Sequence, residues 1–376
     1  MKIAIIGGGP AGLYLAYLLK RENSGNQVRV FERNTRGATF GFGVVFSDRA
    51  LDFLRDDDGD THDYLLPHME VWPDLKIVHR DEPIAIDGNG FAAIGRLALL
   101  QLLERRCTDI GVTVAFDHPV VSLAAVREAD LVVGADGVNS IVRETHADAL
   151  ASRVGALDNR FVWYGTSRIF DCLTLTFREN ADGVFCAHHY RYSPEMSTFI
   201  VECDKETWRR AGFARLDAQR TRAYCEAVFA PELAGHPLIS NKSIWRRFPS
   251  IWADRWSDGH AVVVGDALRT AHFSIGSGTR LAMEDAIALN RALGDTGADI
   301  PAALLRYEET RRPPVEKIVS GANASARWYE RMAETTRLSP YDFAHDYMIR
   351  TGRVSDTRLQ RIAPRFMARY LAGKAA

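Results

Sequence analysis

The chain has 376 residues, of which 47% are hydrophobic and 25% are charged, and its formal net charge at pH 7 is −1. This length can bury the cores of two lobes, and the composition is that of an ordinary globular protein. The near-neutral charge gives no reason to expect a nucleic-acid partner. No uncharged run reaches membrane-spanning length, so we expect no membrane association. The five cysteines are scattered and form no CxxC pair, so we expect no metal site and a cytoplasmic location.

The N-terminal segment predicts a strand, a glycine turn, a helix and a second strand. Lys2–Ile6 is apolar, residues 7–12 have the spacing GxGxxG, and an apolar helical face follows over 13–21. The second strand, 27–31, leads into Glu32, which lies about 20 residues after the third glycine, where a ribose-binding carboxylate is expected. This arrangement is typical of dinucleotide binding.

Each part of this segment has a physical role in holding a dinucleotide. Gly7 permits the tight turn, Gly9 lets a pyrophosphate approach the backbone, and Gly12 lets the helix pack on the strand. The helix N-terminus offers unpaired N–H groups and the positive end of a dipole to the phosphates. The candidate cofactor-binding residues here are Gly7, Gly9, Ala11, Gly12, Glu32 and Arg33.

The next part of the chain extends the first sheet and then changes character. A helix is expected over 96–106, with short strands over 112–116 and 131–133. From Phe161 onward, alternating strands are expected over 173–177, 184–192 and 197–203, and Asp-Gly between the first two favours a tight hairpin. This run predicts a second, antiparallel sheet.

The chain is then expected to return to the first lobe. A helical stretch over 206–229 precedes a buried strand over 260–264 and a helix over 279–293. The remaining tail reads as helical, with breaks at Pro313-Pro314 and Pro340. The predicted division is therefore a discontinuous nucleotide-binding domain over 1–160 and 245–300, an inserted sheet domain over 161–244 and a helical region over 301–376.

Two later fragments carry polar residues at strand ends. The sequence ADLVVGADGVNSIVR (129–143) places Asp136-Gly137 after a strand, and the stretch 260–286 places Asp266 after another. Each acid alone is commonly an ordinary turn residue. Because Gly276-Ser277-Gly278 opens a helix soon after Asp266, the second fragment predicts a site for an anion or a polar ring.

Together, the three fragments resemble the FAD fingerprints of the flavoprotein monooxygenases of the p-hydroxybenzoate hydroxylase type. The resemblance implies an α/β fold with a Rossmann-like FAD-binding domain, an inserted substrate sheet and a helical C-terminal tail. It assigns Glu32 to the adenosine ribose, Arg96 to the diphosphate and Asp266 to the flavin-side ribose or ribityl chain. The cofactor-binding residues that it adds are Val45, Arg96, Asp136, Gly137, Asp266, Gly276, Gly278 and Thr279.

A finer resemblance concerns the substrate. FVWYGTS (161–167), STFIVECD (197–204) and TAHFSIGSGTRLAMEDAIAL (270–289) are similar to the aryl-CoA branch, which contains the salicylyl-CoA 5-hydroxylases and the monooxygenase part of the 2-aminobenzoyl-CoA monooxygenase/reductases. Indole-pigment hydroxylases of the violacein type share several of these segments and remain an alternative. A flavin-binding redox sensor is the alternative from a different class.

The resemblance also implies the chemistry and the partners. NADH or NADPH would reduce FAD transiently, and O2 would form a flavin hydroperoxide. An electron-rich aromatic ring, linked to CoA in this branch, would take up one oxygen atom. For a salicylyl-CoA substrate the product would be gentisyl-CoA. A monomer or a homodimer is expected. Arg209-Arg210 and Arg246-Arg247 are available to CoA phosphates, although each pair also fits a solvated surface.

The candidate residues for the substrate end lie on the predicted middle strands and on the loop before the last helix. His188 and His189 must face opposite sides of a strand, and His188 is preferred because Tyr190 shares its face. A histidine there could deprotonate a phenol. The catalytic candidates are His188, Tyr190 and His272, and the substrate-contacting candidates are Tyr164, Tyr192 and Arg269, the last at a position where the family usually has histidine.

Overall fold

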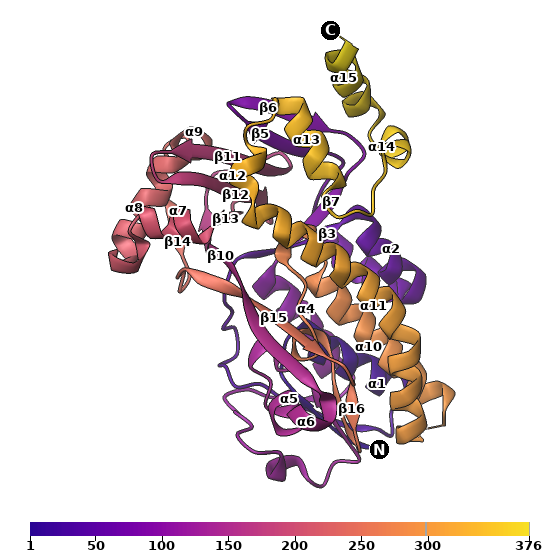
Figure 1. Ribbon diagram of the computed structural model, residues 1–376. Helices are drawn as coiled ribbons and strands as arrows, with labels where there is room; N and C mark the ends of the chain where they lie inside the picture. Colours follow the sequence, from indigo (N-terminus) through magenta and orange to yellow (C-terminus); the bar gives the residue numbers. More distant parts are fainter. Residues whose placement is uncertain (298, 376) are drawn as a thin grey trace.

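The first of three sheets carries the nucleotide-type motif (Figure 1). The computed structural model describes residues 1–297 and 299–375, without the side chains of 48–50 and 375. Neighbouring strands in this sheet are parallel except for the first pair. The strand order is β16 (Ser257–Asp258), β17 (Ala261–Val263), β9 (Leu131–Gly134), β1 (Lys2–Ile6), β2 (Gln27–Phe31) and β8 (Thr113–Ala115).

Helices cover this sheet because its central strands are apolar on both faces, as buried parallel strands are. Helix α1 (Pro10–Glu22) packs against α4 (Arg96–Asp109) and α10 (Gly278–Asp295). The predicted strands 2–6 and 27–31 and the helix that follows the glycine turn are confirmed. Short helices α5 (Ile141–Thr145) and α6 (Ala147–Leu150) follow β9.

The second sheet is mainly antiparallel and lies in the other half of the molecule (Figure 1). It contains the three strands expected from the alternating pattern, but two more strands come from the N-terminal part of the chain, and β10 begins before residue 161. The sheet thus reaches beyond the expected 161–244. Its order is β14 (Leu238–Ser240), β10 (Ser152–Thr166), β13 (Ser197–Cys203), β12 (Gly183–Arg191), β11 (Leu173–Asn180), β5 (Leu75–His79) and β6 (Glu82–Ile86), with β15 (Arg246–Ala253) paired to β10.

Smaller elements join the two halves. A third sheet consists of β3 (Gly43–Ser47), β7 (Phe91–Gly95) and β4 (Glu70–Trp72), with α2 (Asp48–Asp57) and α3 (Gly59–Leu65) between β3 and β4 in the chain. The helical stretch expected over 206–229 forms α7 (Lys205–Arg210) and α8 (Ala218–Val228), followed by α9 (Ala230–Leu233). Single 3₁₀ turns are η1 (Leu66–His68), η2 (Leu123–Val126), η3 (Gly137–Asn139), η4 (Phe213–Arg215), η5 (Gly265–Ala267) and η6 (Phe273–Ile275).

The C-terminal region is helical, but the expected break at Pro313-Pro314 is wrong. Helix α11 (Ile300–Glu330) continues through both prolines. Prolines remove two N–H donors and crowd the preceding turn, yet Tyr307, Val315 and Ala322 stay buried where α11 packs on α10, and this packing holds the helical path. Pro340 does begin a new helix. The remaining helices are α12 (Met332–Thr335), α13 (Pro340–Ile349), α14 (Asp356–Ile362) and α15 (Pro364–Ala375).

Within the described residues, none of the helices combines the length and the apolar character needed to cross a membrane. All five cysteines are buried as free thiols.

Candidate active site

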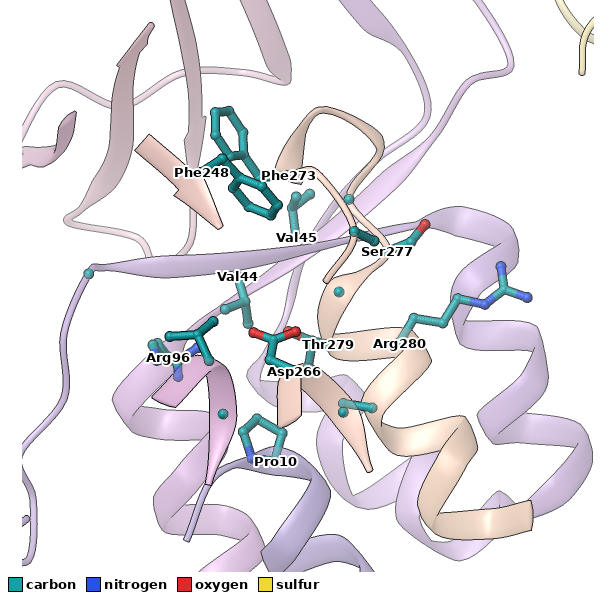
Figure 2. A pocket seen from close by; sticks show the side chains of 18 of the residues that line it. Pro10, Val44, Val45, Arg96, Phe248, Asp266, Phe273, Ser277, Thr279 and Arg280 are labelled. Atoms are coloured by element: carbon teal, nitrogen blue, oxygen red, sulfur yellow. The ribbon is translucent and has the colours of Figure 1, made fainter. Parts of the chain in front are cut away.

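A cavity of about 1310 Å³ lies between the first and second sheets. Its walls come from the glycine turn after β1, the ends of β9 and β17, the segment that enters α10 and strands of the second sheet. Figure 2 shows Pro10 at one end of the view, Asp266 in the middle and the rings of Phe248 and Phe273 at the other end. The cavity therefore has a polar, glycine-lined arm and an aromatic end.

The glycine turn forms a close-packed cradle. A Cβ atom on Gly12 would lie 2.0 Å from the carbonyl oxygen of Gly7, and one on Gly7, which has φ +109°, would lie 2.3 Å from that of Ala135. A Cβ on Gly9 would meet nothing within 4 Å, because Gly9 faces the cavity. Helix α1 begins at Pro10, and among the described residues no side chain caps it. Its first N–H groups can therefore receive an anion.

Glu32 lies at the carboxyl end of β2 beside this cradle. Its Oε2 accepts a hydrogen bond of 2.7 Å from the Gly8 backbone N–H, and its Oε1 accepts one of 2.8 Å from the Asn34 backbone N–H. Both Glu32 and Arg33 line the cavity, as does Ala11 in the first turn of α1. The carboxylate can thus accept a hydrogen bond from a hydroxyl group in this part of the cavity.

Asp136 and Gly137 line the same arm from the end of β9. The Oδ2 of Asp136 accepts a hydrogen bond of 2.7 Å from the Ile141 backbone N–H, while its Oδ1 is buried without a partner among the described residues. Burial raises the pKa of Asp136. An unsatisfied buried acceptor is costly, so this oxygen is suited to a ligand donor such as a hydroxyl or an N–H.

Asp266 follows β17 and faces the cavity opposite Arg96, the first residue of α4 (Figure 2). The Asp266 side chain is exposed to the cavity, where desolvation by the surrounding protein raises the pKa of its carboxyl and the charges of Arg269 and Arg96 oppose this effect. The cavity therefore offers a cation and an acceptor between its polar arm and its aromatic end.

The start of α10 forms the next part of the wall. Helix α10 begins at Gly278 without a cap from any side chain that the structure describes, and Thr279 lies in its first turn. Gly276 has φ +60°, and a Cβ there would lie 3.4 Å from Cγ1 of Val45 on β3. All four residues line the cavity. The glycines let a flat ring system approach the backbone, and the open helix N-terminus favours negative charge on that ring.

The aromatic end lies under the second sheet. The Phe273 ring centroid is 5.0 Å from that of Phe161 and 5.9 Å from that of Phe248, and all three rings line the cavity. His188 and Tyr190, on one face of β12, complete this wall. Tyr190 donates its hydroxyl to the Gly43 carbonyl at 2.9 Å, so its oxygen is already engaged. An aromatic substrate would be well shielded from water here.

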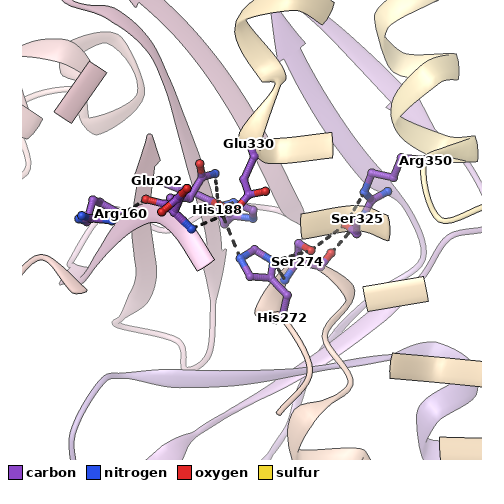
Figure 3. Close-up of polar contacts among 10 residues, drawn as sticks. Arg160, His188, Glu202, His272, Ser274, Ser325, Glu330 and Arg350 are labelled. Carbon is purple, nitrogen blue, oxygen red and sulfur yellow. Dashed lines mark hydrogen bonds and ion pairs between the residues drawn. The ribbon is translucent and has the colours of Figure 1, made fainter. Parts of the chain in front are cut away.

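His188 is held by the buried carboxylate of Glu202, which is not among the residues predicted from the sequence (Figure 3). Its Nε2 lies 3.2 Å from Oε2 of Glu202, whose Oε1 accepts a hydrogen bond of 2.8 Å from Asn159 Nδ2. Burial alone would raise the pKa of Glu202, but the neighbouring histidines and the hydrogen bonds from His188 and Asn159 lower it overall. The available signal was one carboxylate in the otherwise uncharged stretch STFIVEC.

His272 connects Glu202 to the C-terminal helices (Figure 3). Its Nε2 lies 3.6 Å from Oε1 of Glu202, and its Nδ1 lies 2.8 Å from Ser274 Oγ, which in turn lies 2.7 Å from Ser325 Oγ. Arg350 Nε donates to Ser325 Oγ at 2.8 Å. Because Arg350 can only donate, the hydrogen bonds run from Arg350 through the hydroxyls of Ser325 and Ser274 to Nδ1 of His272. Burial lowers the pKa of His272 to about 4, so its ring is neutral at pH 7.

Gly12 packs beneath the cradle and does not line the cavity, and neither do four of the expected catalytic and substrate-contacting residues. Tyr164 is 1% exposed in the core of the second sheet, and Tyr192 packs behind Gly43, where a Cβ would lie 2.5 Å from its own Cβ. Arg269 is buried and pairs with Asp285 at 2.7 Å. His272 lies behind the wall, next to Glu202. Each is held by packing or pairing that the sequence pattern does not reveal, so direct substrate contact is not retained for them.

Comparisons with known proteins agree with this geometry. A model described as an FAD binding domain matches residues 111–322, and one described as an NAD(P)-binding Rossmann-like domain matches residues 5–69. Salicyloyl-CoA 5-hydroxylase of Streptomyces sp is 41% identical over 93% of this chain and 70% of its own. Protodeoxyviolaceinate monooxygenase of Chromobacterium violaceum is 37% identical, covering 92% and 94%. The structure of Pseudomonas aeruginosa PqsL with 2-aminobenzoylacetate superimposes with a TM-score of 0.70 at 21% identity, covering 93% and 99%.

Proposed function

The chain belongs to the FAD-dependent aromatic monooxygenases, and we propose that its substrate is an aromatic acid carried as a coenzyme A thioester. The first candidate is salicylyl-CoA, which would be converted to gentisyl-CoA. The observation that carries the proposal is the aromatic end of the cavity, which holds His188 beside Glu202 and opens directly into the glycine-lined arm. The 41% identity to a salicyloyl-CoA hydroxylase supports the thioester.

The residues of the polar arm fit FAD. The cradle at Gly9, the open start of α1, the carboxylate of Glu32 and the unpaired oxygen of Asp136 match a dinucleotide's phosphates and hydroxyls. Bound FAD, with NADH or NADPH as reductant and O2 as co-substrate, would supply the oxygen atom that enters the ring. The start of α10 would favour negative charge on the flavin. The rings of Phe161, Phe248 and Phe273 would orient the substrate and exclude water.

His188 would accept the proton of the substrate's phenol. Glu202 is an acceptor for the hydrogen on Nε2, so the neutral imidazole keeps that hydrogen and leaves Nδ1 as the basic atom. Removing the phenolic proton makes the ring more electron-rich and therefore a better nucleophile toward oxygen. Glu202 then acts by positioning His188 and by stabilising its protonated form.

The test uses the FAD-loaded enzyme with a substrate panel. Salicylyl-CoA, free salicylate and an indole-derived acid are each added with NADH or NADPH, and reductant loss is followed together with product mass. The proposal expects rapid reductant loss with salicylyl-CoA and a mass gain of about 16 Da on an intact thioester, as insertion of one oxygen atom requires. Product from the free acids alone would overturn the thioester assignment. Reductant oxidation that no aromatic compound accelerates would favour a redox sensor.

A further inference from the structure

Three arginines line the cavity on the side of the C-terminal helices. Arg280 lies in the first turn of α10, Arg353 lies between α13 and α14, and Arg358 lies in α14. In Figure 2 the Arg280 side chain points away from Asp266 and from the polar arm. The three cations therefore belong to a different part of the wall from the glycine cradle.

Carboxylates do little to neutralise this group. Arg280 pairs with Glu284 at 2.7 Å, but neither Arg353 nor Arg358 has an acidic side chain of the described residues within salt-bridge distance. Burial, and then the charges of Arg358 and Arg280, lower the pKa of Arg353. Like charges gathered at one wall repel each other. A bound anion would therefore reduce the electrostatic repulsion among the three arginines.

The position of Arg353 is supported by the helix beneath it. A Cβ on Gly321 of α11 would lie 2.8 Å from Cδ of Arg353, so the absence of a side chain at 321 leaves the space that the arginine stem occupies. Gly321 also lines the cavity. The guanidinium is thus placed by backbone packing rather than by an acidic partner.

The cluster lies on the wall that leads away from the aromatic end. Tyr347, Met348 and Arg350 line the cavity in the same segment of chain as Arg353. The Tyr347 ring is 6.4 Å from that of Tyr329, whose ring is 5.2 Å from that of His188. A ligand with its ring beside His188 can therefore extend along this wall toward the arginines.

We propose that Arg280, Arg353 and Arg358 form a subsite for the phosphate groups of a second nucleotide-bearing ligand, namely the CoA portion of the aryl thioester. The inference rests on the proposed function. FAD phosphates have their own donors at the start of α1 and at Arg96, so these arginines are left for another phosphate-bearing molecule. Arginine suits phosphate because its planar fork donates two parallel hydrogen bonds. The phosphates of NADH or NADPH share this chemistry and are separated from CoA by the experiment.

The experiment measures binding of CoA, and separately of NADH and NADPH, to the FAD-loaded enzyme by calorimetry. The variants are Arg353→Gln and Arg358→Gln. Arg361→Gln is the matched control, because Arg361 is an exposed arginine of the same helix α14 that does not line the cavity. Arg358 is exposed with no side-chain hydrogen bond to the described residues, so its variant should fold even if loss of the Arg353 stem disturbs packing. FAD content and thermal unfolding verify both.

We expect each cavity variant to weaken CoA binding by about tenfold or more, with Arg361→Gln unchanged. Added salt should weaken CoA binding to the wild type more than to the variants. If the variants weaken only NADH or NADPH binding, the phosphate subsite stands and CoA is not its occupant. If no ligand is affected, or if Arg361→Gln has the same effect as the other two, the subsite is overturned.

A parallel assay separates this inference from the proposed function. Turnover is compared for salicylyl-CoA and for salicylyl-N-acetylcysteamine, a thioester without phosphates. A rise in KM for the CoA ester alone supports the subsite. Hydroxylation of salicylyl-CoA with the same KM in all variants keeps the function and rejects the subsite. Weakened CoA binding without any hydroxylation of salicylyl-CoA keeps the subsite and rejects that substrate.

Discussion

The Nε2 atom of His188 lies 3.2 Å from Oε2 of Glu202, and both side chains are almost completely buried. Strand β12 provides the histidine and β13 the carboxylate, and the two strands pair antiparallel with Cys186 opposite Glu202. The carboxylate therefore reaches diagonally across the sheet. This relationship determines which nitrogen of His188 carries hydrogen, and the first prediction follows from it.

Glu202→Gln should lower kcat for aromatic-dependent NADH oxidation by about 100-fold, because loss of a positioned general base costs at least that much. The amide keeps the shape but cannot stabilise a protonated His188. The loss should fall on kcat, while KM and FAD content change little. His188→Gln should have a similar effect. His189→Gln, on the opposite face of β12, is the control, and equal activity of all three variants would contradict the role of the pair.

Gly9→Ala and Gly12→Ala should fail in different ways. A Cβ at Gly12 would lie 2.0 Å from the Gly7 carbonyl oxygen, whereas one at Gly9 would meet nothing within 4 Å of the protein. We expect Gly12→Ala to give little folded protein and Gly9→Ala to fold normally but lose FAD, because the methyl group occupies the space of the pyrophosphate. Expression yield, thermal unfolding and bound-flavin absorbance measure the difference. A Gly9→Ala protein with full FAD content would refute the placement.

Glu32→Ala should purify with less FAD. The variant loses the acceptor for a ribose hydroxyl and releases the Gly8 N–H that Glu32 now binds. A lost hydrogen bond to a charged group corresponds to roughly ten- to hundredfold weaker binding. The ratio of flavin to protein absorbance and titration with added FAD measure the loss. Glu22→Ala, at the exposed end of α1, provides the control and should retain the wild-type ratio.

His189→Phe should flatten the acid dependence of folding stability. Burial, together with the charges of His188 and Lys76, lowers the pKa of His189 to about 3, while in the unfolded chain it is about 6.5. Below pH 6.5 the unfolded state therefore binds one more proton, and the free energy of unfolding falls by up to about 1.4 kcal/mol per pH unit. Urea unfolding between pH 7 and 5 should show a smaller slope in the variant. An unchanged slope would mean that His189 is protonated in the folded protein.

The sequence predicted the strands, turns and helices well where spacing or alternation within a short segment determines them. The turn at Gly7–Gly12, the helix after it and Glu32 follow from spacing alone, and alternation placed His188 and Tyr190 on one face and His189 on the other. The path of α11 through Pro313 was not predictable, because packing on α10 outweighs the proline effect.

Contacts between residues far apart in the chain also could not be predicted, because a single sequence carries no periodic pattern that marks them. Strand β5 joins the second sheet through parallel pairing with β11, almost a hundred residues later in the chain. Arg269 is engaged by Asp285, and Glu202 by His188 and Asn159. Each of these relationships depends on where two side chains meet in space, so composition and periodicity do not reveal them.

Two uninterrupted elements, β10 and α11, run between the halves of the molecule (Figure 1). Swinging the halves apart would require bending a paired strand and a packed helix together, which is far costlier than moving a loop. Ligand traffic should therefore depend on small segments such as 273–278, which carry Gly276 and lie at the cavity wall. The two halves of the molecule should then stay fixed relative to each other, and the rate of turnover would depend on movement of segment 273–278.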